Sequence, residues 1–476
     1  MSRAFRMLVN GKLVPGQSGT FQVINPSTGK PFAECPQCSK AQLDEAVLAA
    51  QAAFPSWAAT DPKKRKDMMM AGAGKVQQSL NSLAEVLVRE QGKPLNNAKG
   101  EIMGIIGYMQ YFGNTDYEFE KVIVDTAKER VLQRRTPLGV VGGITPWNFP
   151  PLMGAWKMAE ALMTGNTMVL KPSPYTPLST LMLGEILADS FPPGVFNVVS
   201  GGDELGRWMT EHEGIAKISF TGSTRTGKAI QASSSGTLKR LTLELGGNDA
   251  AIVLDDADPK AAATGVFNQA MGNSGQICIA IKRLFVHESK FDAVVNELTT
   301  LAKKAKVGDG FKDGVAYGPI NNKMQFDRVS ELVEDAKKQG AKVHAGGQPL
   351  QGEGDGYFYP PTILTGVKEG TRVVDEEQFG PVLPVMPYSD VADAVRRTNA
   401  TAYGLGGSVW GSDVEKAAEV AAQIQSGTVW VNGHGMLTPD VPFGGMKESG
   451  IGRQMGEGTL EGYTDTKVIR IPKSKM

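Results

Sequence analysis

The chain has 476 residues, more than a single hydrophobic core usually serves, so we expect two domains or more. Lysine plus arginine and aspartate plus glutamate both number 50, which gives no electrostatic drive toward nucleic acid or an anionic membrane. No run of 18 apolar residues and no signal-peptide pattern occurs, so neither membrane insertion nor secretion is expected. Three cysteines make no disulfide framework, which favours a cytoplasmic protein.

The first part of the chain is predicted to be mainly helical. Ser39 followed by Gln42 matches a capping box, in which each residue satisfies the backbone of the other at a helix start. The helix that it opens is expected at 40–57, and longer helical stretches follow at 62–91 and 95–120.

From Leu138 onward, short apolar runs alternate with helical segments, which is typical of a parallel, doubly wound sheet. A first series has expected strands at 138–144, 167–171, 195–199 and 216–220, with helices at 152–164, 178–190 and from Ser223. A second series has expected strands at 250–254, 282–287, 382–386, 406–410 and 428–432, with helices at 289–306, 323–339, 390–398 and 413–425. A glycine-rich surface loop is expected at 345–356.

Cys278 is the first candidate for chemistry. It follows the flexible stretch Gly272-Asn273-Ser274-Gly275, which would give a substrate access to the thiol. A thiolate is a strong nucleophile once its pKa is lowered. The alternative is a small buried core residue, which is the commoner role of a single cysteine.

Glu244 and Asn148 are the next two candidates. Glu244 ends an apolar strand shortly before Gly246-Gly247, where a buried carboxylate is costly unless it has a task. Asn148 lies in a proline-bounded turn, where its amide could donate to a developing oxyanion. An ion-paired strand-end glutamate and a turn asparagine that satisfies its own backbone are the alternatives.

A glycine-rich strand-to-helix turn contains Gly222, Ser223, Gly227 and Lys228. Amide groups at a helix N-terminus bind phosphate, and the Ser223 hydroxyl could contribute. The stretch nearly matches a P-loop, but Ala229 replaces the serine or threonine that would hold magnesium. Phosphate binding is therefore expected and magnesium-dependent hydrolysis is not.

Cys35 and Cys38 have the spacing of a redox or zinc motif. No second cysteine pair follows and the four histidines are scattered along the chain, so no metal site is expected.

Taken together, these motifs resemble the aldehyde dehydrogenase superfamily from about residue 8 to residue 470. The matching stretches, in family order, are Thr145-Pro146-Trp147-Asn148-Phe149-Pro150, Lys171-Pro172-Ser173, Phe220-Thr221-Gly222-Ser223, Glu244-Leu245-Gly246-Gly247, Gly275-Gln276-Ile277-Cys278, Glu376-Glu377-Gln378-Phe379-Gly380-Pro381 and Pro442-Phe443-Gly444-Gly445-Met446-Lys447-Glu448-Ser449-Gly450.

The resemblance implies a catalytic role for four residues. Cys278 would attack the aldehyde, and Asn148 with the Cys278 amide would hold the oxyanion. Glu244 would activate the water that hydrolyses the thioester, and Lys157 would assist proton transfer away from that base. The branch of the family that passes the acyl group to coenzyme A generally lacks this glutamate, so a free carboxylic acid is the expected product.

The resemblance also implies NAD or NADP as cofactor. Lys171 and Glu377 would bind the two riboses, the helix at Ser223 would face the pyrophosphate, and Phe379 would pack at the nicotinamide. The further expected cofactor contacts are Thr145, Pro146, Trp147, Ser173, Pro174, Gly222, Gly227 and Leu245.

Two positions depart from the family pattern. Pro174 stands where a glutamate commonly accepts from the adenine ribose, so the 2′-phosphate of NADP would meet no repulsion, and Arg225 or Lys228 could attract it. Gln454 stands where relatives often carry a second glutamate near the base. Because an amide cannot take a proton, the relay beyond Glu244 and Lys157 is in doubt.

The substrate tunnel implied by the resemblance is wholly apolar, so an uncharged aliphatic or aromatic aldehyde is expected. A semialdehyde is the alternative, because Arg283 or His434 could reach the mouth. A catalytically silent binding protein is disfavoured, since it would not need Cys278, Glu244 and Asn148 together. The expected lining is Phe149, Met153, Trp156, Ile277, Ile279, Leu437 and Phe443.

The predicted architecture is α/β, with three parts. A Rossmann-like dinucleotide-binding domain is expected at 1–118 and 137–246, and an α/β catalytic domain at 247–447. The segments 119–136 and 459–476 match the family's bridging β element, which implies a homodimer or homotetramer.

Overall fold

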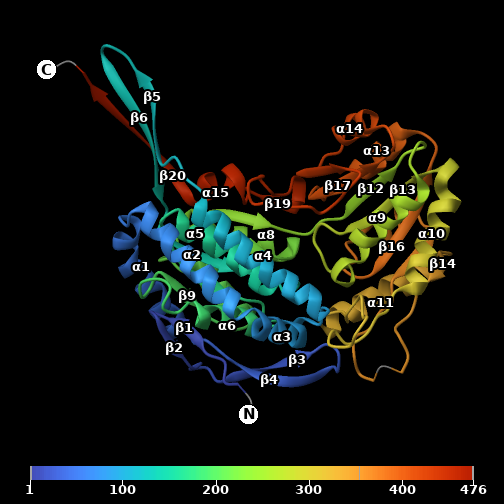
Figure 1. The fold of residues 1–476 in the computed structure, drawn as a ribbon, viewed down its shortest axis with the longest axis horizontal. Helices are drawn as coiled ribbons and strands as arrows, with labels where there is room; N and C mark the ends of the chain where they lie inside the picture. The colour runs from blue at the N-terminus through green and yellow to red at the C-terminus, as the bar shows by residue number, and fades with distance from the viewer. Residues whose placement is uncertain (1–2, 353, 474–476) are drawn as a thin grey trace.

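The computed structural model describes residues 3–352 and 354–473 of the chain. Within that part it has two large, mainly parallel sheets with helices on their faces, and a narrow three-stranded arm that projects from the body (Figure 1). The mixed α/β class with parallel sheets is therefore confirmed. The ends of the predicted ranges, at residues 1–2 and 474–476, lie outside the described residues.

The first sheet has eight strands in the order β19-β11-β10-β7-β8-β9-β1-β2. The five central strands are parallel, and antiparallel strands lie at both edges. Their bounds are β1 (Met7–Val9), β2 (Lys12–Val14), β7 (Val140–Ile144), β8 (Thr167–Lys171), β9 (Phe196–Val198), β10 (Lys217–Thr221), β11 (Arg240–Glu244) and β19 (Gly450–Ile451).

The helices of this half cover both faces of the sheet and largely match the predicted segments. The capping box is confirmed, since the Ser39 side chain accepts from the Gln42 backbone and the Gln42 side chain accepts from that of Ser39. The helices are α1 (Lys40–Ala58), α2 (Pro62–Gln78), α3 (Leu80–Gln91), α4 (Leu95–Asn114), α5 (Pro150–Met163), α6 (Leu178–Ile186), α7 (Asp203–Glu211) and α8 (Thr224–Ser233).

Two helical predictions are corrected in their extent. The stretch 62–91 is two helices, because the backbone leaves helical geometry at Ser79 and α3 turns to pack on α6 and β3. The stretch 95–120 ends at Asn114, and Glu120 already starts a strand.

The second sheet has seven strands in the order β14-β15-β16-β13-β12-β17-β18, all parallel except the edge pair β14–β15. Successive residues of β12 belong to different apolar cores, because a strand points its side chains to alternate faces. The strands are β12 (Asp249–Val253), β13 (Ile281–His287), β14 (Lys342–Ala345), β15 (Thr362–Thr365), β16 (Val382–Tyr388), β17 (Gly406–Trp410) and β18 (Thr428–Val431).

The helices of this half are α9 (Pro259–Met271), α10 (Phe291–Lys304), α11 (Lys323–Lys338), α12 (Arg372–Asp375), α13 (Val391–Asn399) and α14 (Val414–Ala421). The predicted segments do not include α9, although Asp258 caps it and Pro259 occupies its first turn. This helix matters for the site, since the loop that carries Cys278 begins where it ends.

The projecting arm is a three-stranded antiparallel sheet in the order β20-β6-β5. It brings β5 (Glu120–Asp125) and β6 (Glu129–Pro137) beside the C-terminal β20 (Thr464–Pro472), which follows α15 (Gly456–Tyr463). Every side chain of β5 is exposed. A separate hairpin, β3 (Thr20–Asn25) with β4 (Lys30–Pro36), lies near the N-terminus. Among the described helices, none is long and apolar enough to cross a membrane.

Candidate active site

Cys278 lies on a tightly wound loop between α9 and β13. Asn273, Ser274 and Gly275 all adopt positive φ angles, of 49°, 56° and 71°. A side chain at Gly275 would collide with the Gly380 carbonyl, so only glycine allows this close approach between the two segments. The Cys278 side chain is half-buried and packs against the apolar core of the first sheet.

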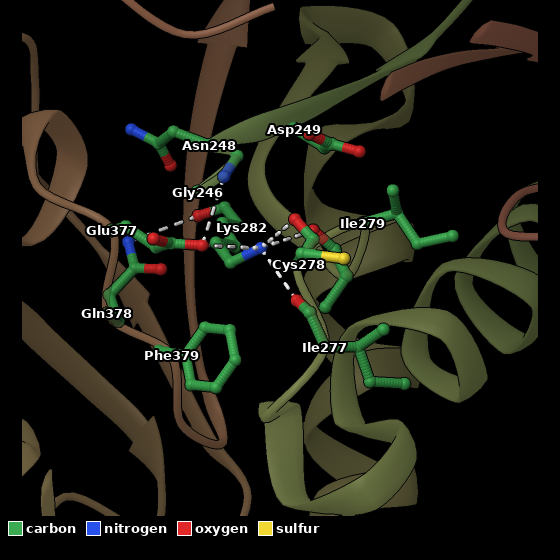
Figure 2. Close-up of polar contacts among 12 residues, drawn as sticks. Gly246, Asn248, Asp249, Ile277, Cys278, Ile279, Lys282, Glu377, Gln378 and Phe379 are labelled. Carbon is green, nitrogen blue, oxygen red and sulfur yellow. Dashed lines mark hydrogen bonds and ion pairs between the residues drawn. The ribbon is translucent and has the colours of Figure 1, made fainter. Parts of the chain in front are cut away.

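Lys282 holds this loop in place (Figure 2). Its Nζ donates to the carbonyl oxygens of Ile277 and Cys278 at 2.9 and 2.7 Å. The same ammonium lies 3.5 Å from the Glu377 carboxylate, and both side chains are largely buried. One cation thus connects the backbone of the proposed nucleophile to a predicted cofactor ligand.

The surroundings of Cys278 favour the protonated thiol at neutral pH. Burial raises its pKa to about 12; the Lys282 ammonium opposes this rise, whereas Asp249, Glu377 and Glu244 add to it. A nucleophilic role therefore requires a base nearby, because the thiolate is the reactive form.

Glu244 occupies the carboxyl end of β11, opposite Thr221 of β10 in the sheet register. It is buried, and neither carboxylate oxygen has a hydrogen-bond partner among the described residues. Burial raises its pKa to about 8, while Lys157 and Arg453 lower it. A carboxyl group that titrates near neutrality can accept and return a proton at working pH.

Lys157 approaches Glu244 from α5. Its side chain is wholly buried, and Nζ donates to Thr221 Oγ1 at 2.8 Å. Burial lowers its pKa to about 8, against the opposing effect of Glu160 and Glu244. The register of β10 with β11 therefore brings the predicted base and the predicted proton-transfer lysine to the same edge of the sheet.

Asn148 lies beside the loop that carries Cys278. Its Nδ2 donates to the Gln276 carbonyl at 2.8 Å, so the amide is already directed toward this loop. The Asn148 carbonyl accepts from Lys93 Nζ at 2.9 Å and from Asn273 Nδ2 at 3.2 Å. Lys93 in turn forms a buried ion pair with Glu101 at 2.5 Å.

The predicted cofactor ligands surround the carboxyl ends of the first sheet. Lys171 ends β8, and burial lowers its pKa to about 8. Glu377 accepts from the Gly247 amide at 3.1 Å. Phe379, at a φ of 50°, meets Trp147 edge-on with ring centroids 5.2 Å apart.

The turn before α8 has the geometry expected of an anion site. Ser223 is the N-cap, and its hydroxyl accepts from the Thr226 amide at 3.2 Å. Gly227 packs so closely on Leu245 that a side chain would approach it to 2.5 Å. Lys228 is paired with Glu448 at 2.9 Å, which leaves Arg225 as the exposed cation of this turn without an ion pair among the described residues.

Other predicted cofactor positions lie at the same sheet edge with different exposure. Thr145 is buried, and its hydroxyl has no hydrogen-bond partner within the described chain. The Ser173 hydroxyl accepts from the Tyr175 amide at 3.3 Å, while Pro146 and Pro174 are half-buried. No group of three or more histidine, cysteine or acidic residues able to hold a metal ion occurs among the residues described.

The structure brings five of the seven predicted tunnel residues into one apolar cluster. Ile279 and Phe443 are part of the core of the first sheet, and Trp156, Ile277 and Leu437 pack against it together with Cys278. Phe149 is not part of this cluster, and Lys93 Nζ lies 3.9 Å from its ring centroid. Met153 is half-buried on α5 and is not part of this cluster.

The two predicted mouth residues are both buried. Arg283 is buried in the second sheet, where its guanidinium donates to the carbonyls of Asn248 and Thr398 at 2.9 and 3.0 Å. His434 is also buried, and its Nε2 lies 2.6 Å from the Ile279 carbonyl. The Arg283 guanidinium is therefore not available to a distal carboxylate, whereas His434 Nδ1 has no hydrogen-bond partner among the described residues, so the semialdehyde alternative stays a prediction.

Comparison with known proteins decides the family. The aldehyde dehydrogenase family model matches residues 13–469. Human retinaldehyde dehydrogenase 3 is 39% identical over 98% of this chain and 92% of its own length. An NAD+ complex of an aldehyde dehydrogenase from Bacillus cereus is 36% identical, with a TM-score of 0.96 over 99% of this chain and 97% of that one.

This chain belongs to the aldehyde dehydrogenase family.

A variant of betaine aldehyde dehydrogenase from Staphylococcus aureus, also bound to NAD+, is 33% identical with a TM-score of 0.95 over 99% of this chain and 97% of that chain. Relatives named for retinaldehyde and for betaine aldehyde are thus both similar to this aldehyde dehydrogenase. Family membership therefore establishes the type of reaction and leaves the substrate open.

The structure adds functional candidates that sequence reasoning missed. Lys93 donates to the Asn148 carbonyl and forms an ion pair with Glu101. Lys282 donates to the Cys278 carbonyl. Lys93 and Glu101 had no sequence signal, since an ion pair reaching a turn about 50 residues away leaves no local pattern. For Lys282, its position four residues after Cys278 at the start of a strand was the available clue.

Proposed function

We propose that this aldehyde dehydrogenase oxidises an uncharged aldehyde to the carboxylic acid, with Cys278 as nucleophile and Glu244 as base. The observation that carries the proposal is the pair of buried, unpartnered Glu244 oxygens beside Lys157. Such a carboxyl group is costly to bury without a chemical task. Cys278 and Asn148, the other members of the set, meet at one loop.

The first step needs a base and an oxyanion site. The Cys278 thiol passes its proton to the Glu244 carboxylate as sulfur attacks the aldehyde carbon. The carbonyl oxygen then becomes an oxyanion, which the Asn148 amide and the Cys278 backbone amide stabilise. For this the Asn148 Nδ2 exchanges its present partner, the Gln276 carbonyl, for the oxyanion.

The second stage releases the product. A nicotinamide dinucleotide, when bound, would accept the hydride from the adduct on Cys278, which would leave a thioester on this residue. Once Glu244 has released to solvent the proton that it took from Cys278, its carboxylate takes a proton from water, which attacks the thioester carbon. The Cys278 thiol leaves with a proton, and the carboxylic acid is free to depart. Lys157 stabilises the carboxylate form of Glu244 throughout.

The residues present fit a nicotinamide dinucleotide. The α8 N-terminus with Ser223 suits the pyrophosphate, the orphaned Thr145 hydroxyl is available as a donor, and Lys171 and Glu377 suit the ribose hydroxyls. Relatives in complex with NAD+ support NAD as acceptor. Because Pro174 places no carboxylate near the adenine ribose, we propose that NADP is also accepted, with Arg225 as its phosphate partner.

The substrate class is proposed from the lining of the site. The residues that pack with Cys278 in the apolar cluster carry no charge, and the Arg283 guanidinium is held by the Asn248 and Thr398 carbonyls. The test is a panel of hexanal, benzaldehyde and succinic semialdehyde with NAD and with NADP. The highest kcat/KM is expected for hexanal or benzaldehyde. A clear preference for the semialdehyde would overturn the substrate class, and inactivity toward every aldehyde would indicate a silent family member.

We propose that the arm formed by β5, β6 and β20 joins subunits into a homodimer or homotetramer. Both edges of this small sheet, β5 and β20, carry exposed apolar side chains, among them Ile123 and Val468 at 46% and 54% exposure. Unpaired strand edges are ready templates for another chain. Light scattering of wild type and of Ile123→Lys is the test; a monomeric wild type would contradict the proposal. We also propose that residues 1–118 and 137–246 form the cofactor domain and that residues 247–447 form the catalytic domain.

A cytoplasmic location is proposed from the thiol chemistry. All three cysteines are free, and the mechanism requires Cys278 to stay reduced. Fractionation of the producing cells tests this; recovery of the protein outside the cytoplasm would contradict it.

A further inference from the structure

Glu160 is a wholly buried carboxylate behind the proposed base. It lies on α5, and its oxygens accept hydrogen bonds from the Tyr108 hydroxyl at 3.1 Å, the Met455 amide at 2.8 Å and the Gln454 side-chain amide at 2.9 Å. None of these donors is a cation. Among the described residues no lysine or arginine forms a direct ion pair with it, so its charge must be balanced at longer range.

The cation that this charge can stabilise is the Lys157 ammonium. The two residues are three apart on α5, so they lie on the same face of the helix. Both are wholly buried, and Lys157 Nζ is fixed on Thr221 Oγ1, opposite Glu244 in the strand register. Glu244, Lys157 and Glu160 therefore form an alternating acid, base, acid series in a water-poor interior, where charges interact strongly.

Gln454 explains why Glu160 is needed. A neutral amide at this position cannot balance a buried ammonium group, and the Gln454 Nε2 is directed at Glu160 Oε2. The carboxylate and the amide thus form one donor–acceptor pair across α5 and the segment before α15.

We propose that Glu160 is the counter-ion that keeps Lys157 charged beside Glu244 and so supports thioester hydrolysis. The inference rests on the proposed function of Glu244 as hydrolytic base. Glu160 is a positioning residue, because it acts through Lys157 and touches neither the nucleophile nor the base.

The electrostatics of the cluster give the expected direction. Glu160 is the first of the groups that raise the pKa of Lys157, against the lowering by burial, and it also raises the pKa of Lys217 on β10. The other titratable groups that face Glu160 are Tyr108 on α4, Tyr117 beyond it, Tyr463 on α15 and Glu244 on β11. The three tyrosines have raised pKa values and stay neutral. Among the described residues, Glu160 and Glu244 are therefore the two acidic groups that raise the pKa of Lys157.

The test transposes the acid and the amide. Glu160→Gln removes the charge, whereas Glu160→Gln combined with Gln454→Glu restores one carboxylate and one amide with their hydrogen bond reversed. The readout is the pH dependence of thioester hydrolysis in single turnover, which should rise as Glu244 ionises and fall as Lys157 loses its proton. Removing the charge should move the falling limb toward acid by about one pH unit, and the transposed variant should return it.

Glu90→Gln is the matched control, since Glu90 is another wholly buried glutamate but caps the start of α6 at Leu178 and Ser179. It should leave the falling limb in place. The inference is overturned if the falling limb of the pH profile stays in place in folded Glu160→Gln. It is also overturned if the limb moves in Glu160→Gln and does not return in the transposed variant. If Glu160→Gln does not fold, the transposed variant decides alone: a wild-type limb supports the counter-ion and a displaced limb refutes it. A wild type without aldehyde oxidation would instead refute the proposed function itself.

Discussion

Replacing Lys93 with methionine should damage both the fold and the oxyanion site. Lys93 and Glu101 are each 1% exposed, and their Nζ and Oε2 atoms lie 2.5 Å apart. The same Nζ donates to the Asn148 carbonyl at 2.9 Å. Methionine keeps the length of the chain but removes the charge and every donor. Glu101 would then be a buried carboxylate without a cation.

The size of both effects follows from this burial. Removing one partner of a buried ion pair typically costs about 3–5 kcal/mol of unfolding free energy, because the other charge stays in the low-dielectric interior. Asn148 would also lose one of the two contacts that fix its backbone carbonyl. A catalytic group displaced by roughly 1 Å can lose about 100-fold in rate, so we expect a fall in kcat of that order with little change in KM.

Urea unfolding and steady-state kinetics measure the two effects separately. Lys93→Met with Glu101→Leu should recover most of the stability, since no buried charge is left, but should not recover kcat. Lys323→Met is the surface control: its partner Asp327 is 55% exposed, so its loss should cost about 0–1 kcal/mol. Wild-type stability together with wild-type kcat in Lys93→Met would refute the reasoning.

Three further predictions concern the chemistry itself. Glu244→Gln should slow the first turnover of hydride transfer, because Glu244 takes the Cys278 proton, and should lower steady-state turnover by about 10²–10⁴-fold; wild-type rates in both phases would argue against Glu244 as the base. The rate of thioester hydrolysis should rise from pH 6 toward pH 8, because burial raises the pKa of Glu244 to about 8 and only its ionised form is a base; a flat profile over this range would exclude it as the titrating group. The kcat/KM values with NAD and NADP should lie within roughly 100-fold of each other, or about 2.7 kcal/mol. A preference for NAD of several hundredfold would show that Arg225 does not bind the 2′-phosphate of NADP.

The predicted strands of both large sheets are found because buried parallel strands leave a strong sequence signal. The run 167–171 is strand β8 with the same bounds, and all of its side chains are buried. The motif residues Asn148, Glu244 and Cys278 could be found for a related reason, since each lies within three residues of a glycine or proline that marks a sharp turn. Local chemistry of this kind is readable from the sequence.

Features that depend on distant partners were not readable. Glu160 has no local pattern that distinguishes it from a surface glutamate, and its donors come from α4 and from the segment before α15. The error over Arg283 has a geometric cause. Lys282 and Arg283 are neighbours on β13 at the point where its register with β12 shifts. The Lys282 ammonium donates to the Cys278 carbonyl, whereas the Arg283 guanidinium donates to the carbonyls of Asn248 and Thr398.

The covalent state of Cys278 during turnover tests the central claim most directly. The enzyme is mixed with aldehyde and NAD, quenched in acid within one turnover and digested, and the peptide that contains Cys278 is weighed by mass spectrometry. The account predicts an acyl thioester on Cys278 in the wild type that is absent from Cys278→Ala. Aldehyde oxidation by Cys278→Ala at the wild-type rate, with no acyl group on this peptide in the wild type, would contradict it.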